Sequence, residues 1–193
     1  MEKELFEAAY ANRLEVVRSL LRDHPTVDVN MGNEVSISPL HVATLGGYFE
    51  VTKLLLVHPN IKVNLQTFGG ATPFLGGCMY GQVAVVRLML RDPRVNIALA
   101  DSNGCTPLWQ AAHKGCLEVV EWLIASGRDL GDLNSEGKWR GKFNNALEVA
   151  REKNKDDVVS LLERFFANPE QTRAEIKQKL NYEGIFLFSF DFK

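Results

Sequence analysis

The chain has 193 residues, of which 46% are apolar and 24% are charged, and its formal net charge is −2 at pH 7. These values describe a globular chain with enough apolar material for a core, and they exclude a fibrous or intrinsically disordered protein. The pI is near 6.1 and acidic and basic residues are mixed along the chain, so nothing indicates nucleic acid or an anionic membrane as a partner.

The N-terminal stretch and the cysteines bear on the location of the protein. MEKELFEAAY is acidic and amphipathic, and it lacks the basic segment and apolar run of a secretory signal. The longest apolar runs, LLLV and GIFLF, are too short to span a bilayer. Cys78, Cys105 and Cys116 form an odd and sparse set, which suits reduced thiols better than a disulfide framework. We therefore predict a cytoplasmic protein, with the nucleus as an alternative, that has no membrane partner.

The decisive feature of the sequence is an internal repeat of 34 residues. The segments SPLHVATLGGYFEVTKLLL, TPFLGGCMYGQVAVVRLML and TPLWQAAHKGCLEVVEWLI begin at Ser38, Thr72 and Thr106 and align without gaps. Two weaker copies, KELFEAAYANRLEVVRSLL from Lys3 and NALEVAREKNKDDVVSLLE from Asn145, keep the apolar positions but lose the Thr-Pro opening. Five units therefore cover residues 3–166, and a period of this length indicates a stacked repeat architecture.

Each full unit predicts two helices. Ser or Thr followed by Pro favours the start of a first helix, because the hydroxyl caps the helix and Pro has no amide hydrogen to leave unpaired. Nine residues after the cap, Gly47, Gly81 and Gly115 end this helix. The pattern xVVxxLL then places apolar residues three and four apart, as a second amphipathic helix requires. Segments such as HPNIKVN and DPRVNIA contain Pro and Asn and predict turns between units.

The most regular unit carries a resemblance to a known family. DSNGCTPLWQAAHKGCLEVVEWLI, residues 101–124, closely follows the pattern D-x-x-G-x-T-P-L-x-x-A-A-x-x-G-x-L-E-V-V-x-x-L-L, and the sequence thereby resembles the ankyrin repeats. SPLHVA keeps the family's histidine at His41, whereas Leu75 and Trp109 replace it in the next two units. The resemblance implies an all-α solenoid of stacked helix-turn-helix pairs with short β-hairpin fingers and atypical terminal units. We expect this repeat domain to span residues 1–167.

The resemblance also implies where a partner protein binds. In ankyrin proteins the two residues before the first-helix glycine, together with finger residues before the cap, form an exposed concave surface. We expect Leu45, Phe68, Met79 and Tyr80 to form an apolar patch of the kind that marks interaction sites. Alternatively, the finger residues fold down onto the helices and the patch is smaller. The predicted binding residues in these positions are Val35, Ile37, Leu45, Phe68, Met79, Tyr80, His113 and Lys114.

Two adjacent glycines, Gly76 and Gly77, lie inside the predicted first helix of the third unit. Gly77 aligns with alanine in the four other units, a position that must be small where helices approach closely. Gly76 aligns with larger residues, and a glycine within a helix costs about 0.5–1 kcal/mol relative to alanine. Two interpretations stay open for Gly76: sequence drift in a unit supported by its neighbours, or a gap in the binding groove.

An insertion, LNSEGKWRGKFNN, lengthens the spacing between the fourth and fifth units to 39 residues. It surrounds Trp139 with the cations Lys138, Arg140 and Lys142. A tryptophan beside cations on a long loop is typical of an interface with an acidic partner, and we predict Trp139 and Arg140 as binding residues. The alternative is that Trp139 and Phe143 pack over the fourth unit while the charges are merely solvated.

The sequence offers no chemistry for catalysis, for a cofactor or for a metal. His113 and Cys116 have an H-x-x-C spacing, but a structural zinc needs four convergent ligands. No histidine pairs with a nucleophile in a recognisable motif, and no phosphate-binding loop occurs. We therefore expect a protein that is not an enzyme, binds no cofactor and holds no metal.

The resemblance raises one hypothesis of modification. Asn30 and Asn64 follow valine in the turn before the next finger, where ankyrin proteins are often hydroxylated by an asparaginyl hydroxylase. Asn64 has Leu56 eight residues upstream, as such sites tend to have. Alternatively, these asparagine side chains bond the backbone of the turn.

Residues 168–193 follow the repeats. Asn168 and Pro169 are a helix start, and ANPEQTRAEIKQKL predicts one more helix, to about Leu180. In GIFLFSFDFK four phenylalanines occupy alternate positions, which predicts a strand-like tail that must cover apolar surface. The helix and tail either close the open end of the fifth unit or pair with another chain. We expect a monomeric interaction scaffold or adaptor that binds another protein. The alternative is a regulatory subunit that self-associates through the aromatic tail.

Overall fold

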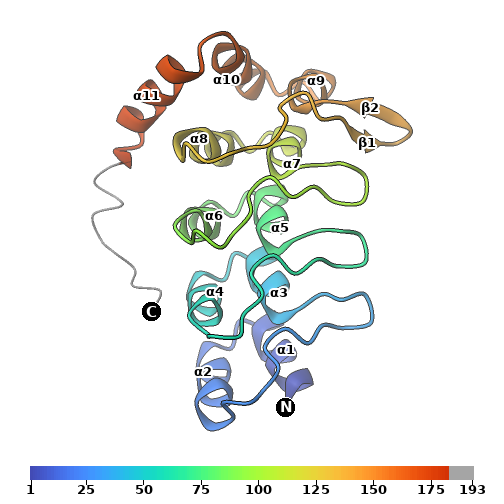
Figure 1. Ribbon diagram of the computed structural model, residues 1–193, viewed down its shortest axis with the longest axis vertical. Coiled ribbons are helices and arrows are strands. Elements are labelled where there is room, and N and C mark those ends of the chain that lie inside the picture. The colour runs from blue at the N-terminus through green and yellow to red at the C-terminus, as the bar shows by residue number, and fades with distance from the viewer. Residues whose placement is uncertain (183–193) are drawn as a thin grey trace.

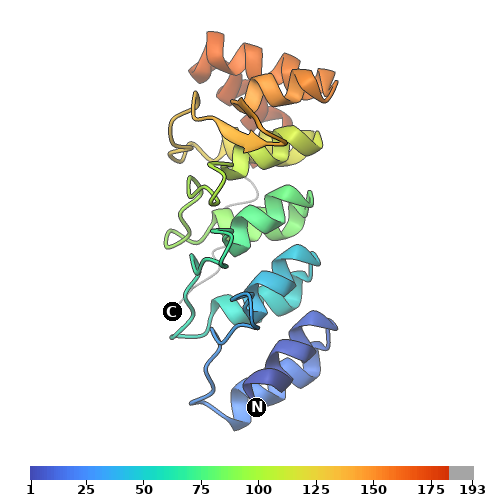
Figure 2. The same ribbon diagram turned by 90° about the vertical axis from the view of Figure 1, so that its right-hand side faces the viewer.

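The computed structural model describes residues 1–182, so the strand predicted from GIFLFSFDFK lies outside the described residues. Residues 1–182 form eleven α-helices and one two-stranded antiparallel sheet. The first ten helices form five pairs stacked in chain order, which confirms the predicted solenoid (Figures 1 and 2). The pairs are α1 (Glu2–Tyr10) with α2 (Leu14–Asp23), α3 (Pro39–Leu45) with α4 (Phe49–Leu56), α5 (Pro73–Met79) with α6 (Val83–Leu90), α7 (Pro107–Lys114) with α8 (Leu117–Ala125), and α9 (Ala146–Glu152) with α10 (Asp156–Ala167).

The first helix of each of the last four pairs begins at a side-chain cap. The hydroxyls of Ser38, Thr72 and Thr106 accept a hydrogen bond from the backbone amide three residues later, and proline follows each of them. In the fifth unit Asn145 takes over this role. Its side chain accepts from the amide of Glu148 at 3.0 Å, and the Glu148 carboxylate accepts from the amide of Asn145 at 2.9 Å. These caps satisfy amide groups that the helix itself leaves unpaired, so the starts of the helices are fixed locally.

The first helix of every pair also ends in the same way. Gly47, Gly81 and Gly115 have φ angles of 71°, 66° and 76°, which L side chains rarely adopt. The equivalent residues of the first and fifth units are Asn12 and Asn154, both with φ of 53°. Asparagine is among the few residues that tolerate this conformation. The two weak terminal units therefore preserve the backbone turn of the repeat without its glycine.

The core lies between two layers of helices. Helices α1, α3, α5, α7 and α9 pack on one another in one layer, and α2, α4, α6, α8 and α10 form the second (Figure 1). The valines and leucines of the xVVxxLL pattern are buried between the layers; among them, Val51, Leu55 and Val85 have no exposed surface. Burying one such side chain contributes about 1.5–3 kcal/mol. Because each unit contacts mainly its neighbours, the stability of the stack is built from these interfaces.

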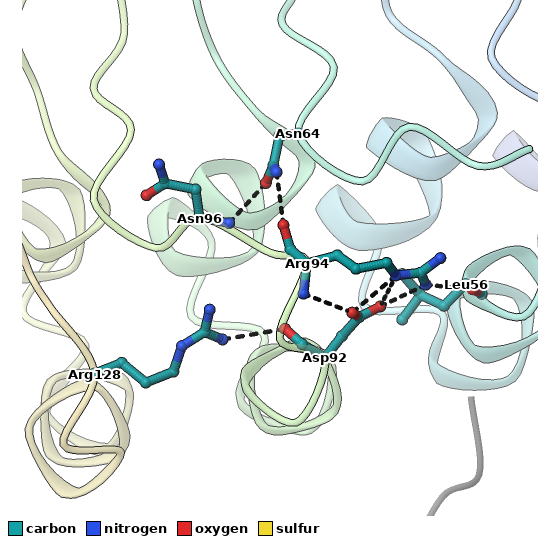
Figure 3. Close-up of polar contacts among 6 residues, drawn as sticks. All are labelled: Leu56, Asn64, Asp92, Arg94, Asn96 and Arg128. Atoms are coloured by element: carbon teal, nitrogen blue, oxygen red, sulfur yellow. Dashed lines mark hydrogen bonds and ion pairs between the residues drawn. The ribbon is translucent and has the colours of Figure 1, made fainter. Parts of the chain in front are cut away.

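A row of asparagines joins successive turns between the units. The side chain of Asn30 donates to the carbonyl of Asn60 at 2.8 Å and accepts from the amide of Lys62 at 2.7 Å. One unit later, Asn64 repeats both bonds, to the carbonyl of Arg94 at 2.7 Å and from the amide of Asn96 at 2.8 Å (Figure 3). Each asparagine thus bonds the turn of the following unit instead of its own.

Two arginines add a second link between the same turns. Asp92 is fully buried and forms an ion pair with Arg94 at 2.6 Å, and Arg94 also donates to the carbonyl of Leu56 in the preceding unit at 2.8 Å. From the following unit, Arg128 donates to the carbonyl of Asp92 (Figure 3) and to that of Leu90. The third unit is therefore held on both sides through its buried Asp92.

The fingers differ from the prediction in one respect. Those before the second, third and fourth units are turns, each closed by two backbone hydrogen bonds, such as those from the Thr67 amide to the Ala71 carbonyl at 3.0 Å and from the Gly70 amide to the Thr67 carbonyl at 2.8 Å. Within residues 1–182, paired strands occur only where the insertion lengthens the finger: β1 (Gly137–Trp139) and β2 (Lys142–Asn144). The insertion supplies a longer finger, in which two three-residue strands pair on either side of a two-residue turn. The backbone amide of Lys138 also donates to the carbonyl of Asn103 at 2.8 Å, which attaches the hairpin to the preceding finger.

Helix α11 (Pro169–Lys179) follows the repeats and turns back toward the fourth unit. It packs against α8 and α10, beside the second layer of the stack (Figure 1). Lys179 forms an ion pair with the buried Glu121 of α8 at 2.6 Å, and Arg173 donates to the carbonyl of Ile124 at 3.2 Å. None of the helices in residues 1–182 has the length and apolar character that crossing a bilayer requires.

Candidate interaction surface

Two neighbouring fingers and the helices α3 and α5 enclose a pocket of about 310 Å³ on the finger side of the stack. We call it the apolar pocket. The backbone amide of Phe68 donates to the carbonyl of Val35 at 3.2 Å, which joins the two fingers at its rim. The pocket brings together five of the predicted binding residues, namely Val35, Ile37, Leu45, Phe68 and Met79. The remaining lining residues are His41, Thr67, Gly69, Ala71, Thr72, Leu75 and Gly76.

The rim of the pocket is unusually exposed for apolar side chains. Phe68 exposes 76% of its surface and Val35 exposes 47%. Leu45 and Met79 are half-buried inside the pocket. Phe68 therefore does not fold down onto the helices, and it stands over a concave apolar floor. Apolar surface of this kind typically marks a site where another molecule binds.

Gly76 accounts for the shape of the pocket floor. A Cβ atom at Gly76 would lie 3.0 Å from Cδ2 and 3.3 Å from Cγ of Leu45, so an alanine would press against this side chain. A Cβ atom at Gly77 would lie 3.5 Å from Cγ2 of Val86, which is an ordinary contact. The two glycines thus differ: Gly76 leaves space for Leu45 in the pocket, while the position of Gly77 accepts a methyl group.

His41 supports the wall of the pocket. Its Nε2 donates to the carbonyl of Ala71 in the next finger at 3.1 Å, while its Nδ1 lies 2.8 Å from the Ser38 hydroxyl and accepts from the Ser38 amide at 3.1 Å. This arrangement requires the neutral ring. Burial lowers the pKa of His41, which favours the same neutral form. His41 therefore holds α3 and the second finger in a fixed relation.

A second group of predicted residues lies one to two units further along the stack. The ring of His113 stacks on buried Trp109 at a centroid distance of 5.1 Å and contacts Trp139 of β1 at 5.1 Å. Nε1 of Trp109 donates to the carbonyl of Asn144 at 2.8 Å, so the column of three rings anchors both strands of the hairpin. Trp139 remains 41% exposed. It therefore packs on the fourth unit and keeps part of its ring exposed.

Gly137 permits this close packing of the hairpin. A Cβ atom there would lie 2.8 Å from Sγ of Cys105 and 2.9 Å from the ring of Trp109. At the tip, Arg140 and Gly141 have φ angles of 51° and 82°, so both central residues of the two-residue turn adopt the left-handed conformation. The tip is open, and the side chain of Arg140 is exposed.

Six cations lie on the segments that carry the contact between His113 and Trp139, namely the end of α7, the β1–β2 hairpin and the turn after α9, and we call them the basic cluster. Burial lowers the pKa of His113, and the nearby Lys114 and Lys153 lower it further. Glu152 opposes this effect and lies 3.5 Å from Lys142 and 3.3 Å from Lys153. The members of the basic cluster are Lys114, Lys138, Arg140, Lys142, Lys153 and Lys155.

The other predicted site residues lie elsewhere. Tyr80 is 60% exposed at the end of α5 and does not line the apolar pocket. Both functional atoms of the Asn64 carboxamide bond the following turn. Sequence reasoning missed Ala71 and Thr67 as pocket residues. For Gly76 it left two interpretations open, sequence drift or a gap in the binding groove, and the position of Gly76 in the pocket lining favours the gap.

Two of the three thiols, Cys78 and Cys105, are buried. Burial raises the pKa of the Cys105 thiol to about 12 and that of the Cys78 thiol well above its ordinary value, so both are protonated at neutral pH. In the part of the chain that the structure describes, no three His, Cys, Asp or Glu side chains are grouped to hold a metal ion.

Comparison with known proteins agrees with the architecture. A family model described as ankyrin repeats (3 copies) matches residues 5–99, 59–135 and 77–173. These overlapping matches together extend from the first helix pair into α11. No curated protein matches the sequence. The stacked helix pairs and the matched segments together show that the chain belongs to the ankyrin-repeat family.

Proposed function

We propose that this chain is a scaffold or adaptor that binds another protein in its concave groove. Ankyrin repeats generally act as protein–protein interaction modules and are typically not enzymes, which supports this role. The apolar pocket is the anchor point, where a bulky apolar side chain of the partner inserts beneath Phe68. The observation that carries this proposal is the pocket itself, with a phenylalanine exposed at 76% on its rim.

The energetics favour an anchor of this type. Full burial of a Leu or Phe side chain contributes about 1.5–3 kcal/mol, and covering Phe68 itself adds a similar gain. Interfaces take most of their affinity from a few such buried side chains. The fixed walls of the pocket support this role. His41 holds the second finger against α3, so binding costs little conformational entropy.

The proposal is tested by site-specific photo-cross-linking in cells that express the protein. A photoreactive phenylalanine at position 68 probes the pocket rim, and one at position 57 is the control. Val57 is also exposed, at 45%, but it lies between α2 and α4 beside Lys53 and Leu54, outside the apolar pocket. We expect position 68 to capture a discrete protein and position 57 not to.

A third protein, with the position 68 label and Met79→Arg in the pocket, completes the test. Met79→Arg places a charge inside the pocket without touching the rim, so it should abolish the adduct. An adduct pattern that is the same at positions 68 and 57, or that survives Met79→Arg, would contradict the groove as the binding site. Capture of a second copy of this chain at position 68 would favour the alternative of a self-associating subunit.

Two subsidiary proposals accompany this function. We place the protein in the cytoplasm or nucleus, an assignment that the three free cysteines support. Asn64 stays a predicted hydroxylation site. Its carboxamide is engaged by the next turn, so an enzyme acting there needs this turn to open. Peptide mass spectrometry of the protein from its own cells checks for one added oxygen atom on Asn64.

A further inference from the structure

We propose that the groove selects an extended acidic segment of its partner, with a bulky apolar residue in the apolar pocket and carboxylates at the basic cluster about five or six residues away. This inference rests on the proposed function and names the chemistry of the partner. It is carried by two features of the described residues: an apolar cavity and a group of six exposed or half-buried cations.

The two sites are continuous along the stack. Leu45, Met79 and His113 occupy equivalent positions near the ends of α3, α5 and α7, each 34 residues apart. Leu45 and Met79 line the apolar pocket, and His113 lies in the ring column of the basic cluster. The fingers and the β1–β2 hairpin all project from the same side of the stack (Figure 1). One chain lying across the fingers therefore passes over both sites.

The spacing of the repeats sets the length of the partner segment. Packed helices lie about 8–10 Å apart, and the pocket between α3 and α5 is two units from the cluster around α7 and α9. The two sites are thus separated by roughly 16–20 Å. An extended chain advances about 3.3 Å per residue, so five or six residues cover this distance.

The charge of the basic cluster determines which residues the far end of the segment carries. The whole chain has a formal net charge of −2, so the cluster is a local reversal of sign. Within the described residues Glu152 is the carboxylate that pairs with its members, and it lies near two lysines at once. Lys138 and Arg140 project from an exposed hairpin held rigid by Trp109. Asp or Glu side chains on the partner complement this surface, and long-range attraction speeds their association.

The test uses a displayed library of random 15-residue peptides selected on the full chain. We expect enriched peptides to pair a bulky apolar residue with at least two acidic residues five or six positions away. Binding of one enriched peptide, prepared synthetically with a fluorescent label, is then measured by fluorescence anisotropy. Its affinity should fall at least tenfold when the spacer is shortened by three residues, and it should weaken with added salt.

Matched variants separate the two proposals. Lys138→Glu with Lys142→Glu reverses two charges of the basic cluster, and Arg18→Glu with Lys62→Glu makes the same change of net charge on exposed residues outside the groove. We expect a loss of at least tenfold for the first pair and less than twofold for the second. Circular dichroism and elution volume confirm that both fold as the wild type does.

Three outcomes would contradict one or both proposals. In the first, the selected peptides are apolar and lack acidic residues, and their binding survives the Lys138 and Lys142 reversals but not Met79→Arg. This result overturns the inference of an acidic segment and leaves the proposed function intact. Peptides that bind Met79→Arg as well as wild type overturn the groove proposal itself. Concentration-dependent self-association of the unliganded protein in sedimentation velocity, lost in the Lys138 and Lys142 reversals, would identify a second copy of the chain as the occupant and overturn the inference.

Discussion

The apolar pocket and the basic cluster lie at different places along the same repeat scaffold and have opposite chemistry, although one equivalent position contributes to both sites. The residue seven positions after the cap is Leu45, then Met79, then His113. The backbone around these residues is the same in each unit, because the cap before them and the glycine after them are shared. The comparison teaches that local backbone signals fix the scaffold, while the surface chemistry varies freely from unit to unit.

The largest loss of stability is expected from substitution of Trp109, whose ring supports the hairpin of the basic cluster. Trp109→Ala removes a buried ring, the hydrogen bond to Asn144 and the stack with His113, so we expect unfolding to become easier by about 3–5 kcal/mol. Urea denaturation followed by circular dichroism measures this change. The matched control is Trp109→Leu, which is the residue that Leu75 provides at the equivalent position of the pocket unit.

Trp109→Leu should retain part of the apolar packing and lose less stability than Trp109→Ala. It should nevertheless release the hairpin, seen as faster hydrogen exchange of the Lys138 amide, which bonds the carbonyl of Asn103. A loss below about 1 kcal/mol for Trp109→Ala would show that the ring column does not support the basic cluster.

The next largest change in stability is expected on acidification, through His41 in the wall of the apolar pocket. Burial lowers the pKa of His41, so the unfolded chain binds more protons than the folded chain as pH falls below the ordinary value of about 6.5. The stabilisation from neutral His41 is fully present above that value and is lost as pH falls towards the folded-state pKa. We expect the urea midpoint to fall between pH 7.5 and pH 5.5.

His41→Asn identifies the source of this pH dependence. The variant should be less stable at pH 7.5, by about 1–3 kcal/mol, because Ala71 and Ser38 lose their partner. It should also lose less stability than the wild type on acidification. An unchanged pH dependence in His41→Asn would assign the effect to His58 and His113, whose pKa values are lowered as well.

The smallest change in stability is expected from substituting alanine for either of the adjacent glycines Gly76 and Gly77, and its size should differ between them. Gly77→Ala adds a methyl group at an ordinary contact distance, and we expect it to stabilise the protein by about 0.5–1 kcal/mol. Gly76→Ala gives less, because the new methyl group presses on Leu45. Thermal denaturation of the two variants measures the difference. Equal stabilisation by both would mean that Gly76 is not needed to shape the pocket.

The sequence is sufficient for the scaffold because its signals are local. Ser38 and Thr72 cap helices through bonds that span three residues, and the repeat period places every later unit. The same register even locates Asn12 and Asn154, which adopt the glycine conformation without being glycine. These features depend on near neighbours, so periodicity and residue type predict them.

The sites were harder to predict because they depend on contacts between units. Trp109 reads as a replacement for the family's histidine, and only the structure shows that it anchors a hairpin 35 residues away. The sequence allows either drift or a gap in the groove at Gly76, and only the position of Leu45 beside it distinguishes the two. Helix α11 is recognisable from its cap, but its amphipathic pattern does not say which neighbours it covers. Residue patterns predict elements, and the pairing of elements requires coordinates.

Helix α11 has a consequence for the order in which the molecule opens. By bonding Glu121 and Ile124 of α8 while packing on α10, it fastens the fourth and fifth units to each other. The second and third units, which line the apolar pocket, are not contacted by α11 in this way within the described part of the chain. Local opening therefore separates the walls of the apolar pocket more easily than it separates the fourth and fifth units. A bound segment would then be released from its apolar anchor while the basic cluster is still folded.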